Sequence, residues 1–126
     1  MKIILFLGCL LGVTNQLIGQ NLKIKNAEFY YSNYRFYEAT PIFKELILKD
    51  KLSADEFDAV YRHAAISADK SHDYTFEYEI LSKLSISKKY TFDDAFTYFH
   101  LSLFLGFYEN ANTILNSPII KGSNDV

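Results

Sequence analysis

Cysteine is almost absent from this 126-residue chain, since the single thiol belongs to Cys9. Cys9 lies in the apolar stretch near the start, so removal of that stretch would leave a chain without cysteine. Such a chain forms neither a disulfide nor a metal site built from thiolates. Lipoprotein processing at Cys9 is disfavoured because Phe6 stands where leucine is usual, and because the leader before Cys9 would be very short.

Long runs of one chemical kind are also missing. The longest basic run is Lys88–Lys89, and from Asn21 onward 12 Lys and Arg are interspersed with 15 Asp and Glu, a formal net charge of −3. This pattern gives no electrostatic footprint for nucleic acid or an anionic membrane. The longest apolar run, residues 3–13, is much shorter than the roughly 20 residues of a membrane span. We therefore expect no nucleic-acid partner and no stable membrane span after the leader is removed.

Motifs that carry catalysis or metal binding are not found. There is no glycine-rich phosphate loop, no histidine pair at metal-ligand spacing and no serine or cysteine nucleophile motif. His63, His72 and His100 are far apart in the sequence, and a metal site would need Asp69 or Asp73 to join His72. We expect a protein that is not an enzyme and holds neither a cofactor nor a metal.

The segment 1–20 has the layout of a secretory signal peptide. Lys2 supplies a positive charge, an apolar core follows over residues 3–13, and a polar end leads to the small residue Gly19. The pattern predicts cleavage near Gly19 or Gln20. It also predicts export to the periplasm, the outer membrane or the cell exterior. Retention as an anchor is the alternative, which the short apolar run disfavours.

Aromatic residues make up 17% of the chain, although tryptophan is absent, and they follow a helical period. Apolar residues recur at steps of three and four in one stripe, formed by Phe57, Val60, Tyr61, Ala64, Ala65 and Ala68. No segment alternates apolar and polar residues for long enough to predict a strand. The chain is therefore predicted to be all-α, with six helices whose boundaries lie near positions 35, 52, 72, 90 and 106.

Two helix starts are marked by capping boxes, in which a hydroxyl and an acidic side chain bond each other's backbone amides. Ser53 and Glu56 form the first pattern, and Thr91 and Asp94 form the second. Capping also accounts for the acidic pair Asp93–Asp94, which would otherwise suggest a pair of catalytic acids.

Pro41 predicts the start of another helix. A proline lacks the amide hydrogen and clashes with the carbonyl four residues earlier, here that of Tyr37. Both problems disappear in a first turn, whose amides have no partner within the helix. We therefore expect this helix to begin near Phe36 or Tyr37, with Pro41 close to its start.

A helical pattern repeats along the chain. A small or central residue recurs at Ala39, Glu77 and Ala111, at intervals of 38 and 34 positions. The other residues that anchor the pattern are Phe43, Leu81, Gly106 and Tyr108. A helical hairpin that recurs about every 34 residues, with an aromatic, a small and a large apolar residue, resembles the tetratricopeptide repeat.

The resemblance implies a right-handed solenoid of three antiparallel helix hairpins after the signal peptide. The repeat domain is expected over 21–118, with units at about 22–51, 54–87 and 91–118, and residues 119–126 as a tail or the start of further sequence. Two residues depart from the family pattern, Tyr34 in place of the turn glycine and Glu77 in place of alanine. A plain helical bundle is the alternative, since its core would use the same aromatics.

The resemblance also implies a function, because the first helices of such hairpins line a groove that receives a peptide or a partner helix. The positions of this chain that match the groove are Tyr31, Arg62, Ile66, Asp69 and His100. We expect an exported scaffold or adaptor of the cell envelope that binds a protein or peptide through these residues. Each of them is also compatible with an ordinary surface or core position.

The last expected hairpin is apolar on nearly all sides, and a repeat stack needs a polar outer face at its end. We expect a partner, a second copy in a homodimer or a missing C-terminal domain to cover it. Exported repeats of this kind are similar to the N-terminal regions of envelope proteins with an OmpA-like domain. The alternative function is therefore a spacer within a longer peptidoglycan-binding or outer-membrane protein.

Overall fold

The computed structural model describes residues 19–122, and the predicted signal peptide over 1–20 lies outside this part except for its last two residues. Residues 19–32 are helical. Six helices follow, namely α2 (Phe36–Leu48), α3 (Ala54–Lys70), α4 (Tyr74–Leu84), α5 (Phe92–Phe104), α6 (Tyr108–Leu115) and α7 (Pro118–Gly122). Residues 19–122 contain no strand, so the all-α prediction is confirmed.

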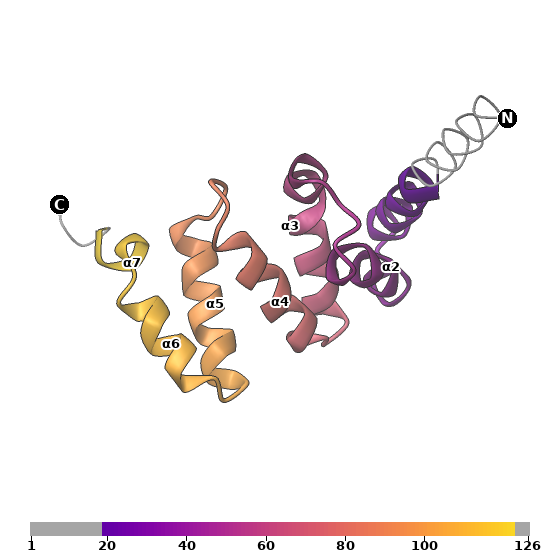
Figure 1. Ribbon diagram of the computed structural model, residues 1–126. Helices are drawn as coiled ribbons and strands as arrows, with labels where there is room; N and C mark the ends of the chain where they lie inside the picture. The colour runs from indigo at the N-terminus through magenta and orange to yellow at the C-terminus, as the bar shows by residue number, and fades with distance from the viewer. Residues whose placement is uncertain (1–18, 123–126) are drawn as a thin grey trace, which may run out of the picture.

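The helices form an elongated row in which each packs against helices close to it in sequence (Figure 1). Each predicted boundary falls in or next to a connection between helices. The structure differs from the prediction near the C-terminal end, where α6 has 8 residues and is followed by the short helix α7. Because α7 packs on both α5 and α6, it covers part of the last hairpin.

Both predicted capping boxes are present. The Ser53 hydroxyl accepts from the amide of Glu56 at 3.2 Å, and the amide of Ser53 donates to the Glu56 carboxylate at 2.9 Å. Thr91 and Asp94 exchange the same two bonds at 3.2 and 3.1 Å. These bonds satisfy amides that have no partner within the helix and fix where α3 and α5 begin.

The position of Pro41 corrects the explanation drawn from the sequence. The helix α2 begins at Phe36 as predicted, but Pro41 is its sixth residue and lies in the second turn. At that position the missing amide leaves the carbonyl of Tyr37 without its usual helical donor. Both Tyr37 and Pro41 are exposed, so water can solvate this carbonyl. The helix tolerates the proline because the broken bond faces solvent.

Three turns share one backbone geometry. Tyr34, His72 and Gly106 adopt positive φ angles of 59°, 59° and 82°. The amide of the next residue donates to the carbonyl five positions earlier, in the pairs Arg35–Tyr30 at 2.8 Å, Asp73–Ala68 at 2.8 Å and Phe107–Ser102 at 2.7 Å. The three turn residues are separated by 38 and 34 positions, which are the intervals found in the sequence.

The backbone after these turns also repeats. Arg35, Asp73 and Phe107 precede the next helix with φ angles of −93°, −92° and −88° and ψ angles of 67°, 70° and 67°. The connection between α2 and α3 contains a further positive φ, 51° at Asp50, with a similar bond from the amide of Lys51. A left-handed residue is a common way to end a helix, so the matching residue after the turn is the more specific repeated feature.

The core runs through the row of helices and uses the predicted repeat positions. Ala39 and Ala111 are buried, and Glu77 in the corresponding position of α4 is buried as well. Phe43 and Leu81 are also buried. Tyr108, however, does not occupy the interior, because it is 68% exposed at the start of α6.

An aromatic contact is nevertheless made at this end of the fold by a neighbouring residue. The ring of Phe107 packs against that of Tyr78, with 4.9 Å between the ring centroids. The aromatic function that the repeat pattern gives to Tyr108 is thus partly taken by the residue before it.

Candidate functional site

The predicted binding residues occupy matching positions relative to the repeated turns. Tyr31 and Asp69 lie three positions before Tyr34 and His72, the residues with positive φ. Ile66 and His100 lie six positions before His72 and Gly106 in the same way. The predicted residues therefore come from matching parts of alternate helices, namely the helix over 19–32, α3 and α5.

Three of these residues line one cavity of about 260 Å³ between α3, α4 and α5. Its predicted residues are Arg62, Ile66 and Asp69 of α3. The other lining residues are Ala65, Lys70, Glu77, Leu81, Asp94 and Thr97. The structure thus brings together one aliphatic side chain and charged groups of both signs, and it places Tyr31 and His100 outside this cavity.

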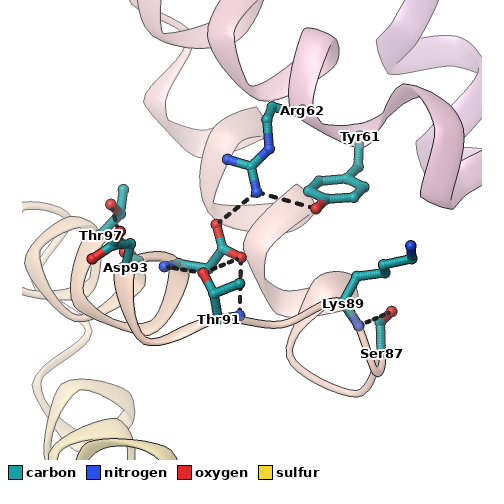
Figure 2. Close-up of polar contacts among 8 residues, drawn as sticks. Tyr61, Arg62, Ser87, Lys89, Thr91, Asp93 and Thr97 are labelled. Carbon is teal, nitrogen blue, oxygen red and sulfur yellow. Dashed lines mark hydrogen bonds and ion pairs between the residues drawn. The ribbon is translucent and has the colours of Figure 1, made fainter.

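Arg62 connects α3 to the start of α5. Its guanidinium donates to the Tyr61 hydroxyl at 3.1 Å and lies 3.5 Å from a carboxylate oxygen of Asp94. The guanidinium carbon also lies 5.2 Å from the centroid of the Tyr61 ring, within reach of its aromatic face. Figure 2 shows Arg62 reaching toward Tyr61 and toward the region of Thr91. These partners hold the guanidinium at the side of the cavity.

Asp94 has two functions in this arrangement. Its carboxylate accepts from the amide and the hydroxyl of Thr91, at 3.1 and 2.8 Å, and it also faces Arg62. The side chain is only 9% exposed, so these partners take the place of water around the carboxylate. The cap predicted from the sequence is therefore also part of the wall of the cavity.

Glu77 is the residue of the cavity that the sequence does not predict as part of a site. It lines the cavity from α4 and is only 8% exposed. Within residues 19–122 its carboxyl has no side-chain hydrogen bond. Burial, together with the nearby charge of Asp69, raises the pKa of Glu77 to about 7. The sequence does contain a signal that could have identified Glu77. It is a charged residue at the position of the repeated pattern that Ala39 and Ala111 occupy elsewhere.

Tyr31 belongs to a separate cluster between the helix over 19–32 and α3. Its ring stacks on His63 with 4.1 Å between centroids and an angle of 15° between the planes. The Nδ1 atom of His63 lies 2.6 Å from a carboxylate oxygen of Glu28. Tyr31 is half-buried by these contacts and helps to join the two helices.

His100 lies on an exposed aromatic face of α5. We define this face by Phe92, Phe96, His100 and Phe104, which follow one another at steps of four positions. All four side chains are exposed, Phe104 to 71% and Phe96 to 53%. The rings of Phe96 and His100 meet edge to face, with 4.4 Å between centroids. The sequence prediction includes only His100 from this face, although the four-residue spacing could have identified the others.

A larger cavity of about 450 Å³ lies between the α2–α3 and α4–α5 connections. Apolar residues including Ile47, Leu52 and Phe57 line it, and the ion pair between Lys83 and Asp50, at 2.6 Å, lies at the same place. None of the predicted binding residues lines this cavity.

The described geometry also bears on metal binding and on membrane insertion. Over residues 19–122, no group of three or more His, Cys, Asp or Glu side chains is placed to hold a metal ion. In the same part of the chain, no helix combines the length and the apolar character needed to cross a bilayer.

Comparisons with known proteins give no relative from which a function could be transferred. No protein-family model matches the chain, and neither curated proteins nor solved structures include a significant match.

Proposed function

We propose that this chain is a scaffold of the tetratricopeptide-repeat type that binds a protein or peptide and performs no catalysis. The binding surface consists of the facing parts of the helix over 19–32, α3 and α5. The observation that carries the proposal is the exposed aromatic face of α5, in which Phe96 and His100 have the same positions relative to the turn as Arg62 and Ile66 on α3.

The repeated turns support the architecture within this proposal. Tyr34, His72 and Gly106 share their left-handed conformation, their closing hydrogen bond and the geometry of the next residue. A stack of three helix hairpins would place one such turn in each unit, and the turns recur at intervals of 38 and 34 positions. A bundle without repeats has no reason to reproduce the same turn at these intervals.

The chemistry of the surface supports a protein or peptide as the partner. Phe96 and Phe104 lie on the surface, although burying an aromatic ring is favourable by about 2 kcal/mol or more. Aromatic residues and arginine are the types that contribute most to binding at protein interfaces. The aromatic face of α5 and Arg62 on α3 thus provide both an apolar and a charged part of the surface.

Selection of peptides on the purified chain tests this function. We expect a random-peptide phage library to yield binders whose affinity falls about tenfold or more when Phe96 or Arg62 is replaced by alanine. Tyr37→Ala is the matched control, because Tyr37 is an exposed aromatic residue of α2 away from the proposed surface. Thermal unfolding of each variant checks that the fold is kept.

Two outcomes of the selection contradict the proposal. One is a library that yields no binder above background. The other is a set of binders that lose equal affinity in Phe96→Ala and Tyr37→Ala, because such binders recognise exposed rings in general.

We also propose that the chain is exported and that its leader is cleaved near Gly19 or Gln20. The support is the charged start, the short apolar core and the small residue near the end of the leader. Cleavage after Gln20 would remove the hydrogen bond from its amide side chain to the carbonyl of Lys51, at 2.7 Å. Expression of the full chain in a Gram-negative host, followed by mass measurement of the periplasmic product, tests this. An intact N-terminus or a product confined to the cytoplasm contradicts it.

A further inference from the structure

The cavity between α3, α4 and α5 contains two carboxyl groups that lack cationic partners. Among the described residues, neither Asp69 nor Glu77 forms an ion pair or a side-chain hydrogen bond. The charge of Asp69 acts on Glu77. Glu77 is more than nine-tenths buried and lines the cavity. Its carboxyl oxygens are not among the fully enclosed unpartnered polar atoms, so they are open to the cavity, where a cation can reach them. A mostly buried carboxylate without a counter-charge gains from such a partner.

The positive groups at the cavity do not supply this partner. Arg62 is held by Tyr61 and Asp94, at 3.1 and 3.5 Å. Lys70 lines the cavity, but its ammonium lies beyond ion-pair distance from both Asp69 and Glu77. When Glu77 is ionised, the three carboxylates Asp69, Glu77 and Asp94 outnumber these two cations. The cavity therefore has a surplus of negative charge.

Part of the cavity wall, away from the carboxyl groups, is apolar. Ala65, Ile66 and Leu81 provide this part of the lining. The volume of about 260 Å³ lies just below the range of pockets that hold drug-sized molecules. It suits one long side chain that has an apolar stem and a charged end. Lysine and arginine have this combination, since their methylene stems pack on apolar surface while the charged ends reach polar groups.

We propose that this cavity receives a lysine or arginine side chain from a bound peptide segment, with Glu77 and Asp69 accepting the cationic end. The inference rests on the proposed peptide-binding function and specifies one side chain of the partner. Charge complementarity identifies the occupant as cationic, because an acidic or purely apolar side chain would leave the carboxylates of Glu77 and Asp69 without a counter-charge.

The ionisation of Glu77 predicts how binding depends on pH. The charged groups that line the cavity together with Glu77 are Arg62, Asp69 and Lys70 from α3 and Asp94 from α5. Since the pKa of Glu77 is about 7, its carboxyl gains its charge near neutrality. A basic peptide should therefore bind more tightly at pH 8 than at pH 6.

Nuclear magnetic resonance titration of the full chain tests the proposal. The probes are the capped pentapeptide Ala-Leu-Lys-Leu-Ala and versions with arginine or norleucine in place of lysine. Norleucine keeps the four-carbon stem and removes the charge. We expect the lysine and arginine peptides to shift the amide signals of Ala65, Ile66 and Leu81. We also expect the norleucine peptide to bind about tenfold more weakly or not at all.

Variants of the protein separate the effect of the carboxylate charge on binding from the effect of side-chain size. Glu77→Gln keeps the size of the side chain and should weaken the lysine peptide about tenfold while leaving the norleucine peptide unchanged. Glu79→Gln, two positions away on α4, lies outside the cavity and is the matched control, which should change neither. Asp69→Asn should weaken the lysine peptide less than Glu77→Gln, because Asp69 is more exposed.

Failure of this inference differs from failure of the proposed function. Equal binding of the lysine and norleucine peptides, binding unaffected by Glu77→Gln, or no shift at the cavity overturns the cationic site. The phage selection decides the broader proposal. If its binders depend on Phe96 but lack an enriched lysine or arginine, peptide binding stands without the cationic site.

Discussion

The carboxyl of Glu77 is buried at a position where the other two repeats of the sequence pattern have alanine. Its pKa is raised to about 7 by burial and by the charge of Asp69, whereas an unfolded chain would hold this group near 4.5. The folded state therefore binds a proton more tightly than the unfolded state between these two pH values.

This difference predicts that the wild-type chain loses stability as pH rises from about 4.5 to about 7. Glu77→Gln should remove this dependence and raise the free energy of unfolding at pH 8 by about 2 kcal/mol. Urea unfolding at pH 5 and pH 8 measures the effect. Glu79→Gln is the control and should leave the pH dependence as in the wild type. An unchanged pH dependence in Glu77→Gln would show that the carboxyl is not buried in this way.

Only some residues of the candidate site are predictable from the sequence, and the reason is physical. Arg62, Ile66 and Asp69 can be grouped because positions on one helix face follow from the helical period. The approach of Arg62 to Asp94, 32 positions further on, depends on how α3 and α5 are placed by α4 between them. The burial of Glu77 depends on the same packing, and its sequence signal is the alignment of Glu77 with Ala39 and Ala111 in the repeated pattern.

Among the elements, the turns test whether the repeat is built into the backbone. Gly106 has a φ of 82°, and a Cβ atom added there would meet no atom within 4 Å. Tyr34 and His72 adopt the same region with side chains that disfavour it. Because residues with a Cβ bear a conformational cost in the left-handed region, the three turns differ in strain.

Removing a glycine from one of these turns and introducing a glycine into another should have opposite effects on the free energy of unfolding. Gly106→Ala should lower the free energy of unfolding by about 1 kcal/mol, and Tyr34→Gly should raise it by up to about 1 kcal/mol. Chemical unfolding of both variants measures this. Gly122→Ala has open space and no positive φ, so it should not show the loss. A free energy of unfolding for Gly106→Ala equal to that of the wild type would contradict the left-handed conformation of this turn.

The attachment of the helix over 19–32 to α2 carries a further prediction. Lys23 of this helix pairs with Glu45 at 2.8 Å, and Lys51 pairs with the same carboxylate at 3.2 Å. These two lysines lower the pKa of Glu45 to about 2. The stabilisation is therefore present above the ordinary pKa of 4.5 and is lost as pH falls toward 2.

Glu45→Gln should lower the melting temperature at pH 5 and should reduce the further drop between pH 5 and pH 3. Melting curves followed by circular dichroism at both values measure this, with the exposed substitution Glu109→Gln as control. A variant that melts like the wild type at pH 5 would show that the pairs contribute nothing to stability.

Helix starts are the part of the fold most fully predictable from sequence. A capping box needs only residues three positions apart, as in Ser53 with Glu56, so the signal is local. Pro41 is explained incorrectly from sequence, because the sequence shows where a helix can begin but not whether a carbonyl in it faces water. Only the exposure of Tyr37 and Pro41 explains why the second turn accepts the proline.

At the scale of the whole molecule, the arrangement of the helices in a row predicts that a destabilising substitution unfolds only the helices around it. The named helices contact only helices near them in sequence, so the two ends of the row are not packed together. The proposed repeat architecture would make stability approximately a sum of the units and of the interfaces between neighbouring units.

Ala111→Arg tests this property, because Ala111 is buried in α6 and arginine would place a long charged side chain there. We expect a loss of more than about 2 kcal/mol, confined to the last helices. Hydrogen exchange should become fast in α6 and α7 while α2 and α3 stay protected. Asn112→Arg, at the exposed neighbouring position, should leave exchange unchanged. Uniform loss of protection over all helices would indicate a single cooperative core.

The row also has a mechanical consequence. The helix over 19–32 and α7 lie at opposite ends of the row in Figure 1, so a force applied through these two helices would run along the stacking direction. Short-range contacts would yield one after another under such a load. The molecule would then extend in several small unfolding steps and would refold when the tension is released.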